Sequence, residues 1–419
     1  MIDIPNIVST VFYFVLVLSV LVLVHEIGHF IFARRFGVRV EEFGLGYPPR
    51  AWTFWKGKGW IQIQGKRIAI PRKFALPAEI QTGSWVTYQT TTENGREVLI
   101  GITPVDAESR GLALASQVQE MDSGTRYTLN WLPLGGFVRM TGEENPSDPR
   151  SFAAAKPWKR AIILVAGATM NVLLAIGLFT AIAMLGQPKP IEEVTVQAVA
   201  PNSPAEGAGL RIGDRVLTID GTPIKNREDL LRMAYERTGQ TIVIEVKRDR
   251  DNAVVTLTPR PQPPKGEGPI GITLAYRLIR EETTAYPIWE AIPIGVARTF
   301  DTGAQIFTGF RKIVQGTAPG SVGGPVQIAQ YTGLAAQLGL LRLMEFTALL
   351  SVNLAIINLF PFPALDGGRL VFVILEALRG GKRIAPEKEG LVHIVGMAIL
   401  LMLMLLITVA DVQRLFTGG

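Results

Sequence analysis

The most prominent feature of the chain is a set of four apolar runs that contain no charged residue. They are Ile7–Val24, Ala161–Gly186, Phe346–Leu365 and Leu391–Ala410, and they are between 18 and 26 residues long. A helix needs about 20 apolar residues to cross the hydrocarbon core of a bilayer. The pattern therefore predicts a polytopic membrane protein with four membrane-spanning helices.

The first run, Ile7–Val24, could instead belong to a signal peptide, which is removed after export. No Lys or Arg precedes this run, and no small-residue cleavage site follows it. It leads directly into His25, Glu26 and His29. We therefore expect the run to be retained as a membrane helix.

Between the second and third apolar runs, residues 192–260 have the pattern of a compact soluble domain. Three segments with alternating apolar and polar positions predict strands: Val194–Val199, Arg215–Ile219 and Ile242–Val246. Residues 226–235 predict a helix with Asn226 as its N-cap. The mixture indicates an inserted α+β domain.

Three other segments have a less specific pattern. Residues 57–125 are polar and strand-like, with many Gly, Thr and Gln residues. Residues 288–315 mix apolar and charged positions, which predicts either an amphipathic helix on the membrane surface or a solvent-packed helix. The proline-rich stretch 261–264 predicts a stiff linker.

Composition narrows the class of protein further. Hydrophobic residues make up 48% of the chain and charged residues only 19%, whereas a soluble domain has about 25% charge. The mean hydropathy of +0.27 also excludes a disordered or fibrous protein. The chain has no cysteine, which excludes disulfide scaffolds, zinc fingers and thiol catalysis.

The distribution of basic residues predicts the orientation in the membrane. Segment 34–160 has 18 Lys and Arg against 12 Asp and Glu, and the short loop 377–390 has four basic residues. Basic loops stay on the cytosolic side, so both segments are expected there. Both termini and residues 187–340 would then lie outside. The net charge of +6 fits a membrane surface, and no nucleic-acid partner is expected.

The strongest chemical motif is His25-Glu26-x-x-His29, which follows the first apolar run. Histidines four residues apart lie on one face of a helix, so both imidazoles can bind one zinc ion. The glutamate can take a proton from zinc-activated water. Two of the chain's three histidines belong to this motif, and ionisable groups in a membrane helix are costly unless they have a function. The alternative is a polar cluster that only caps the helix.

A catalytic zinc site needs a third protein ligand and one open position. The third histidine, His393, lies alone in the fourth run and is more typical of a polar residue satisfied within a helix bundle. Asp366 is the better candidate, because Pro361 and Pro363 break the helix just before it. Alternatively, Asp366 only ends the third span at the membrane interface.

Together these motifs resemble the site-2 protease family, and most closely its bacterial branch with a PDZ domain, typified by the regulator of sigma-E protease. The resemblance covers most of the chain. Beyond the histidine motif and Asn358…Pro361-x-Pro363-x-Leu365-Asp366, it rests on Gly135-Gly136, Ala166-Gly167…Asn171, Pro204–Leu210, Gly213-Asp214, Ile219–Gly221 and Gly323–Val326. The order of these motifs is far more specific than any one of them.

The resemblance implies a zinc endopeptidase that cuts transmembrane segments of single-span membrane proteins, such as anti-sigma factors or remnant signal peptides. An upstream site-1-type protease would trim these substrates first. By the same resemblance, His25, His29 and Asp366 bind the Zn²⁺ ion, and Glu26 is the general base and acid. The chain would lie in the bacterial cytoplasmic (inner) membrane, with the zinc site near the cytosolic side.

The resemblance also suggests how substrate is held. Asn358 would hydrogen-bond the substrate backbone, although bonding between helices is an alternative for this amide and for Asn171. Residues near 130–142 correspond to the family's membrane-associated β-hairpin. Four of them are candidates for strand addition to an unwound substrate: Gly135, Gly136, Phe137 and Val138. The alternative is a hairpin that only seals the cytosolic face.

The predicted fold is thus a four-helix membrane protein with an inserted α+β PDZ-like domain and a membrane-associated β-hairpin. The predicted segments are 1–33 (first membrane helix with the zinc motif), 34–160 (cytosolic region with the extra segment 57–125 and the hairpin), 161–186 (second helix), 187–275 (extracytoplasmic PDZ-like domain), 276–342 (amphipathic membrane-surface region), 343–376 (third helix with the Asp-Gly motif), 377–390 (cytosolic loop) and 391–419 (fourth helix and tail). The segment 57–125 departs from the family pattern and has no assigned role.

Two other functional classes are alternatives to a protease. A catalytically silent membrane scaffold would present the PDZ-like domain, but such a protein has no need of an intact Glu26 beside both histidines. A transporter with a metal site at the membrane midplane would have paired repeats, and the chain has four predicted spans without such repeats. The protease is therefore the preferred hypothesis.

Overall fold

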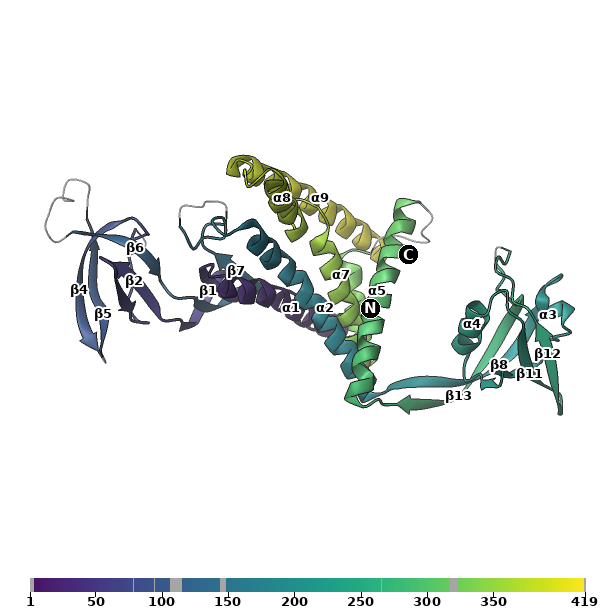
Figure 1. The fold of residues 1–419 in the computed structure, drawn as a ribbon. Helices are drawn as coiled ribbons and strands as arrows, with labels where there is room; N and C mark the ends of the chain where they lie inside the picture. Colours follow the sequence, from purple (N-terminus) through teal and green to yellow (C-terminus); the bar gives the residue numbers. More distant parts are fainter. Residues whose placement is uncertain are drawn as a thin grey trace. The chain divides into compact units, whose positions relative to one another are not determined.

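A computed structural model of the chain describes residues 4–77, 79–93, 95–105, 115–143, 148–264, 266–316 and 323–417. The chain forms two compact units, and Figure 1 shows the helices and strands of each. One unit contains Met1–Ile182 and Ile288–Gly419, and the other contains Ala183–Pro287. The candidate metal ligands all belong to the first unit.

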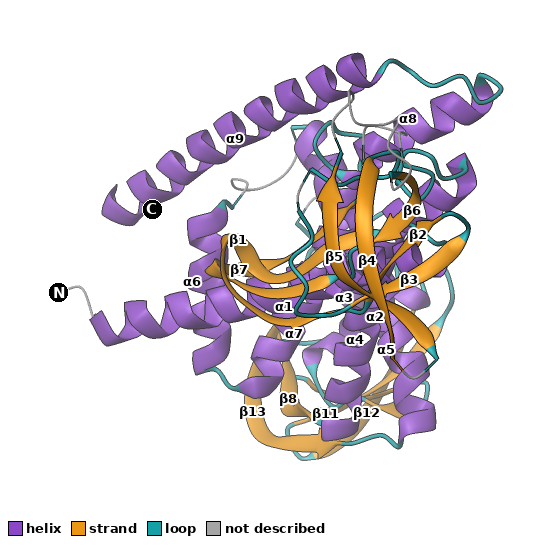
Figure 2. Cartoon of the chain, turned by 90° about the vertical axis from the view of Figure 1, so that its left-hand side faces the viewer, coloured by secondary structure: helices purple, strands orange, loops and turns teal. Residues whose placement is uncertain are grey.

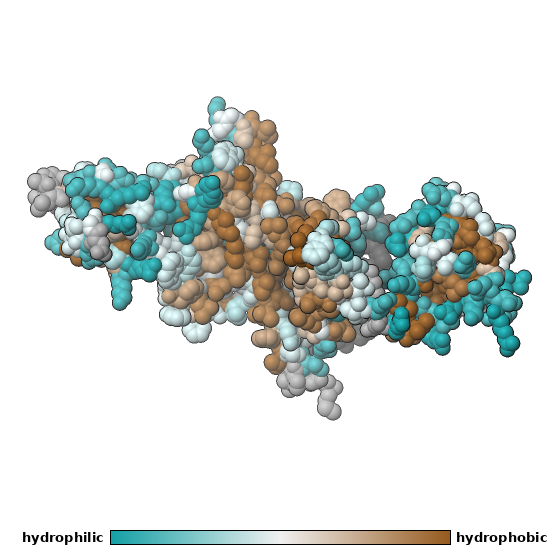
Figure 3. All heavy atoms as spheres, turned by 60° about the horizontal axis from the view of Figure 1, so that its bottom comes forward, coloured by the Kyte–Doolittle hydropathy of each residue, from teal (hydrophilic) through white to brown (hydrophobic). Residues whose placement is uncertain are grey.

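Four of the described helices are long and apolar enough to cross a membrane, as the apolar runs predict. They are α1 (Ile4–Arg35), α2 (Pro157–Leu185), α7 (Leu340–Leu359) and α9 (Pro386–Thr417). The surface of this helical part is largely apolar, whereas the surfaces of the strand-rich parts are largely polar (Figure 3). Outward-facing apolar side chains over a whole helix are expected where the helix contacts lipid.

The predicted third helix, 343–376, is wrong as a single element. The structure has α7, which ends at Leu359, and a separate helix α8 (Asp366–Leu378). Phe360 is already extended, and the two prolines that follow it cannot continue a helix because they lack the backbone N–H. The break therefore places Asp366 in the first turn of α8.

Strands β1 (Val40–Lys56) and β7 (Arg126–Met140) form an antiparallel sheet beside α1 (Figure 2). Both strands are strongly bent, and residues 42–45 of β1 pair with two separate runs of β7, 126–129 and 136–139. Among the described strands, the run 136–139 therefore has a partner on one side only. A strand with one free side can accept a further strand.

The hairpin predicted near 130–142 is wrong in its bounds. Its first arm begins at Arg126, and both arms pair with β1 rather than with each other. Gly135, with φ of +75°, lies at the bend between the arms. The pairing could not be seen in the local pattern, because β1 and β7 are separated in the chain by the whole of segment 57–125.

Segment 57–125 folds into a small closed barrel, apart from residues 78, 94 and 106–114, which lie outside the described part. Its strands are, in order around the barrel, β2 (Gly59–Ile63), β3 (Lys66–Ile70), β5 (Arg96–Pro104), β4 (Trp85–Glu93) and β6 (Ser116–Asp122). Alternate residues of β2 are buried in its core, among them Ile61 and Ile63. The strand-like pattern of the segment is thereby confirmed.

The second unit is an α+β domain with a six-stranded sheet in the order β12-β11-β9-β8-β13, with β10 paired to β9. Its elements are β8 (Gln187–Val199), α3 (Pro204–Gly207), β9 (Arg215–Ile219), β10 (Thr222–Pro223), α4 (Arg227–Glu236), β11 (Ile242–Arg248), β12 (Asp251–Leu257) and β13 (Ile272–Thr284). The three predicted strands are confirmed. Asn226 is the N-cap of α4 as predicted, since its Oδ1 accepts a hydrogen bond from the Asp229 backbone N–H at 2.8 Å.

This domain ends later than predicted. Strand β13 pairs with β8 over its whole length, so the predicted boundary at residue 275 cuts through a strand. The proline-rich stretch 261–264 lies within the unit and links no separate parts. The predicted membrane-surface region 276–342 begins with this strand and continues as α5 (Ile288–Val314) and α6 (Pro325–Gln337), and α5 packs against α7.

Candidate active site

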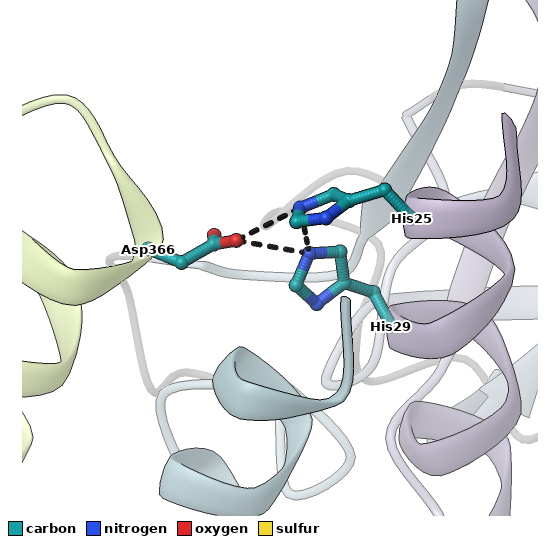
Figure 4. Close-up of side chains that lie close together, drawn as sticks. All are labelled: His25, His29 and Asp366. Atoms are coloured by element: carbon teal, nitrogen blue, oxygen red, sulfur yellow. Dashed lines mark hydrogen bonds and ion pairs between the residues drawn. The ribbon is translucent and has the colours of Figure 1, made fainter. Parts of the chain in front are cut away.

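Helix α1 presents His25 and His29 on one face, and the start of α8 presents Asp366 toward them (Figure 4). The Nε2 atom of His25 lies 3.0 Å from Oδ2 of Asp366, and the Nε2 atom of His29 lies 3.3 Å from the same oxygen. The two Nε2 atoms are 3.1 Å apart. The structure thus brings together the three residues that the sequence predicts as metal ligands.

The spacing of these three atoms fits a tetrahedral zinc site. Zinc binds histidine nitrogen and carboxylate oxygen at about 2.0–2.2 Å, which places neighbouring ligand atoms about 3.3 Å apart. The observed separations of 3.0 to 3.3 Å are close to this value. Both histidines are buried, so a cation that satisfies their ring nitrogens and the carboxylate would stabilise the cluster.

The outer ring nitrogens of both histidines are held by α2. His29 Nδ1 lies 2.8 Å from the carbonyl oxygen of Ile163 and donates to it, which leaves the Nε2 lone pair facing Asp366. His25 Nδ1 lies 3.3 Å from the amide nitrogen of Asn171. Asn171 is fully buried, and its Oδ1 has no hydrogen-bond partner among the described residues.

That unpaired oxygen also fits a metal-bound histidine. If Nε2 of His25 binds zinc, its Nδ1 carries the proton, and turning the Asn171 amide over lets Oδ1 accept it. Such an outer hydrogen bond is typical of zinc-binding histidines. The contact supports an orienting role for Asn171 more than the predicted contact with substrate.

Close contact between α1 and α2 depends on two glycines. A Cβ atom at Gly28 would lie 2.4 Å from the Ala166 carbonyl oxygen, and one at Gly167 would lie 2.5 Å from His29 Nε2. Glycine at both positions therefore makes room for the helix crossing and for the imidazoles. Gly28 and the role of Gly167 were missed in the sequence, although the run of small residues offered a signal. The Ile163 carbonyl offered no such signal, because every residue has a backbone carbonyl.

The three candidate ligands open into a cavity of about 290 Å³. It is also lined by Val22, Glu26, Leu354, Asn358, Ala364 and Leu365. Glu26 thus lies beside the metal-ligand group without belonging to it, and the backbone N–H of Val138 faces its carboxylate. Asn358 Nδ2 lies 3.5 Å from His25 Nε2, at the limit of a hydrogen bond, which places the amide on the cavity wall.

The bend of β7 lies against α1 one turn before the histidine motif. A Cβ atom at Gly135 would overlap the side chain of Val22, and one at Gly136 would contact Leu23. Phe137 points elsewhere, with its ring centroid 6.2 Å from that of Tyr47. The candidate hairpin residues are therefore close to the cavity, but none of the four is part of its lining.

His393 is not part of the metal-ligand group. Its Nδ1 accepts a hydrogen bond of 2.9 Å from the backbone N–H of Ala364. Ala364 has φ of +77°, a left-handed conformation that is strained for residues other than glycine. His393 therefore helps to hold the strained loop that leads into Asp366.

Comparison with known proteins identifies one family. Residues 13–63 and 105–403 match Peptidase family M50. The zinc metalloprotease RasP of Oceanobacillus iheyensis is 33% identical over 97% of this chain and 100% of its own length. The regulator of sigma-W protease RasP of Bacillus subtilis is 30% identical over 98% of this chain and 99% of its own length.

Among solved structures, the PDZ domain of an SdrC-like protein from Listeria monocytogenes covers 20% of this chain and 87% of its own, with 28% identity and a TM-score of 0.18. The family match skips residues 64–104, a stretch that contains strands β3, β4 and β5 of the barrel, and it includes the histidine motif and Asp366. Because that match covers most of the chain and the RasP proteins nearly all of it, the chain belongs to peptidase family M50, the site-2 proteases, and is a zinc metalloendopeptidase.

Proposed function

We propose that this zinc metalloendopeptidase cuts peptide bonds within the transmembrane segments of single-span membrane proteins. The observation that carries the proposal is the location of the donor group. His25 and His29 lie on α1, a helix that is apolar and long enough to cross a membrane. A substrate bond that reaches them must come close to an apolar helix, which a segment of another membrane protein can do.

In this proposal, His25, His29 and Asp366 hold the zinc ion. A bound zinc ion activates water and polarises the scissile carbonyl. The Glu26 carboxylate takes a proton from the attacking water and returns it to the leaving amide nitrogen. Asn358 would hydrogen-bond the substrate backbone beside the scissile bond, and its position on the wall of the same cavity supports this role.

A cleavage assay with a defined substrate tests this function. Purified full-length protein in detergent should cut a single-span protein inside its span, and mass spectrometry of the fragments locates the cut. Removal of zinc by a chelator should abolish cleavage, because the ligand side chains alone cannot activate water as the metal ion does. Added zinc should restore cleavage. Cleavage confined to the soluble part of the substrate would contradict the proposal.

Anti-sigma factors and remnant signal peptides are the proposed substrate classes. One relative is named a regulator of sigma-W protease, which supports an anti-sigma factor as the substrate. An uncut substrate also carries a soluble domain outside the span. An upstream site-1-type protease that removes this domain would let the span approach the cavity, and we include such a partner in the proposal.

The proposed location is the bacterial cytoplasmic (inner) membrane, with the zinc site near the cytosolic side. Both termini and the unit Ala183–Pro287 would lie outside. The excess of basic residues in segment 34–160 and loop 377–390 supports this orientation. Eighteen helical residues before His25 cover about 27 Å, so the motif would lie near the inner edge of the hydrocarbon.

Cysteine labelling tests the orientation, because the chain has no cysteine of its own. An impermeant thiol reagent should label Gln240→Cys in intact cells and should label Arg96→Cys only after the membrane is opened. Both positions are exposed in the structure. Arg110 lies in the same segment but outside the described residues, so Arg96 is the position chosen for the label. The reverse labelling pattern would place the histidine motif in the opposite leaflet.

We also propose that the outer run of β7 holds the unwound substrate. A membrane helix must be opened before its peptide bonds can be cut, and each freed backbone group in hydrocarbon costs several kcal/mol unless it finds a partner. The run 136–139 has a described partner on one side only, and it lies close to the cavity, because the backbone N–H of Val138 faces Glu26. Strand addition on its free side would replace the lost hydrogen bonds.

Val138→Pro should weaken cleavage of a helical span far more than cleavage of a span already loosened by Gly or Pro, with zinc content unchanged. Proline removes the backbone donor and disrupts strand pairing. The ratio of the two cleavage rates is the measurement. Because the Val138 N–H also faces Glu26, an equal loss on both substrates would assign the effect to the catalytic base and not to strand addition.

A further inference from the structure

A second cavity, of about 510 Å³, lies among α2, α5, α6 and α7. Three of these helices each turn four residues toward it at spacing i, i+3, i+4 and i+7, which is one face of a helix. On α7 these residues are Arg342, Glu345, Phe346 and Leu349. Such regular spacing on three helices indicates a cavity built between packed helices.

This cavity does not belong to the metal site. Both cavities are lined by α7, but the second cavity uses Arg342–Leu349 and the metal site uses Leu354 and Asn358. At about 100° per residue, the two sets lie about 150° apart around the helix. Glu345 and Asn358 are also about 20 Å apart along its axis. A substrate that occupies the metal site therefore approaches a different face of α7.

The cavity lies at the end of the helical part where α1 begins. Gly333 of α6 leaves no room for a side chain because Thr10 of α1 packs against it. Gln337 Nε2, at the end of α6, lies 3.4 Å from Asn6 Oδ1. The first turns of a membrane helix mark the boundary between headgroups and hydrocarbon, so the cavity is at headgroup level.

The charges in the cavity are balanced but not fully paired. Glu345 bridges two arginines, with Oε1 2.8 Å from Arg298 Nη2 and Oε2 2.9 Å from Arg342 Nη1. A guanidinium has five N–H donors, so the ion pair with Glu345 leaves donors of Arg342 for an anion. Asp301 has no ion-pair partner among the described residues, and it lies on the same face of α5 as Arg298. The cavity thus offers cationic donors and one carboxylate acceptor side by side.

Exposed apolar side chains continue from this polar end. Leu334 of α6 and Leu338, the C-cap of that helix, are 51% and 65% exposed, and Leu349 of α7 is 39% exposed. The guanidinium of Arg298 lies over the ring of Phe179, 4.9 Å from its centroid, which holds the arginine at the junction. The wall therefore has the amphipathic character of a lipid, with a zwitterionic end and an apolar flank.

We propose that this cavity binds a phospholipid with a primary ammonium headgroup, of the phosphatidylethanolamine class. The phosphate would accept hydrogen bonds from Arg342 and would be attracted by the charge of Arg298, and the ammonium group would donate to Asp301. The acyl chains would lie along Leu338 and the neighbouring leucines. The anionic headgroup of phosphatidylglycerol lacks the ammonium group and would place only negative charge beside Asp301, which disfavours it.

Lipid retention by the purified full-length protein tests the proposal. The protein is reconstituted with an equimolar mixture of phosphatidylethanolamine, phosphatidylcholine and phosphatidylglycerol that share the same acyl chains, and retained lipid is counted by native mass spectrometry. The wild-type protein should retain phosphatidylethanolamine in preference to both others. Asp301→Asn should reduce this preference about tenfold, the effect of losing one charge-assisted hydrogen bond.

Two further variants separate the contributions. Arg342→Gln should reduce retention of all three phospholipids, because each has a phosphate. Asp251→Asn makes the same chemical change as Asp301→Asn at an exposed position of the other unit, and it should retain lipid as the wild-type protein does. Equal retention of the three headgroups, or equal behaviour of Asp301→Asn and Asp251→Asn, would overturn the proposal. So would an Asp301→Asn protein with altered cleavage in lipid-free detergent and unchanged lipid retention, since the cavity would then serve a substrate.

Discussion

A chain with glutamine in place of Glu26 should still bind zinc and substrate, but it should lose its cleavage activity. Glutamine has almost the same shape as glutamate, but its amide cannot take a proton from water and return it to the leaving nitrogen. General acid–base catalysis contributes about 10²–10⁴-fold to the rate, so the turnover number should fall by a factor of that size. Zinc should remain, because Glu26 lies outside the group of three metal-ligand candidates.

The measurement combines turnover of a single-span substrate with elemental analysis of the same preparation. Glu236→Gln is the matched control, since it makes the same change on a side chain that is 58% exposed in the other unit. The control should have normal turnover and normal zinc. Normal turnover of Glu26→Gln protein would falsify the assigned role, whereas loss of zinc would make Glu26 part of the metal site.

The metal-ligand candidates can be predicted from the sequence because their signals are local. The i, i+4 spacing of His25 and His29 places them on one helix face whatever the rest of the chain does. Asp366 is recognisable from the prolines that end α7 just before it. The same prolines also predict a break in the helix, and the prediction of 343–376 as one helix did not include this break.

The outer partners of the histidines could not be predicted in the same way. The carbonyl of Ile163 and the amide of Asn171 act through the packing of α2 against α1, which places them 2.8 Å and 3.3 Å from the imidazoles. Backbone carbonyls carry no sequence signature, and an asparagine in a membrane helix has several possible partners. Their role as hydrogen-bond partners of the histidines can be recognised only from the packing of α2 against α1 in the structure.

The sheet beside α1 shows the same limit for strands. Alternation predicted strands within the barrel and the α+β domain, because it is a local pattern of each strand and does not depend on which strand it pairs with. Residues 42–45 of β1, however, lie between two runs of β7, a strand that follows the whole barrel in the chain. Pairing at such sequence separation is set by the assembled fold, so a local hairpin was predicted where two bent strands interlock.

Loss of a metal ligand is the second large effect that we expect. Wild-type protein should contain about one zinc per chain, as expected for a single catalytic site. His25→Ala and Asp366→Ala should each lower zinc affinity by more than the roughly 10–100-fold that loss of an outer hydrogen-bond partner costs. Each change removes one of three donor atoms that lie 3.0 to 3.3 Å apart, and neither leaves a side chain that could replace it.

Two matched variants make this prediction specific to the three residues. Asn358→Ala removes a side chain 3.5 Å from His25 Nε2, at the cavity wall, and should retain zinc. Asn171→Ala removes the outer partner of His25 and should reduce zinc affinity by about 10–100-fold without abolishing binding. Zinc titration of metal-free protein measures the affinities of the wild type and the four variants. The expected order of affinity, from tightest to weakest, is wild type and Asn358→Ala first, then Asn171→Ala, then the two ligand variants.

Full zinc occupancy in both His25→Ala and Asp366→Ala protein would show that the metal is bound elsewhere, and it would separate the zinc site from the histidine motif.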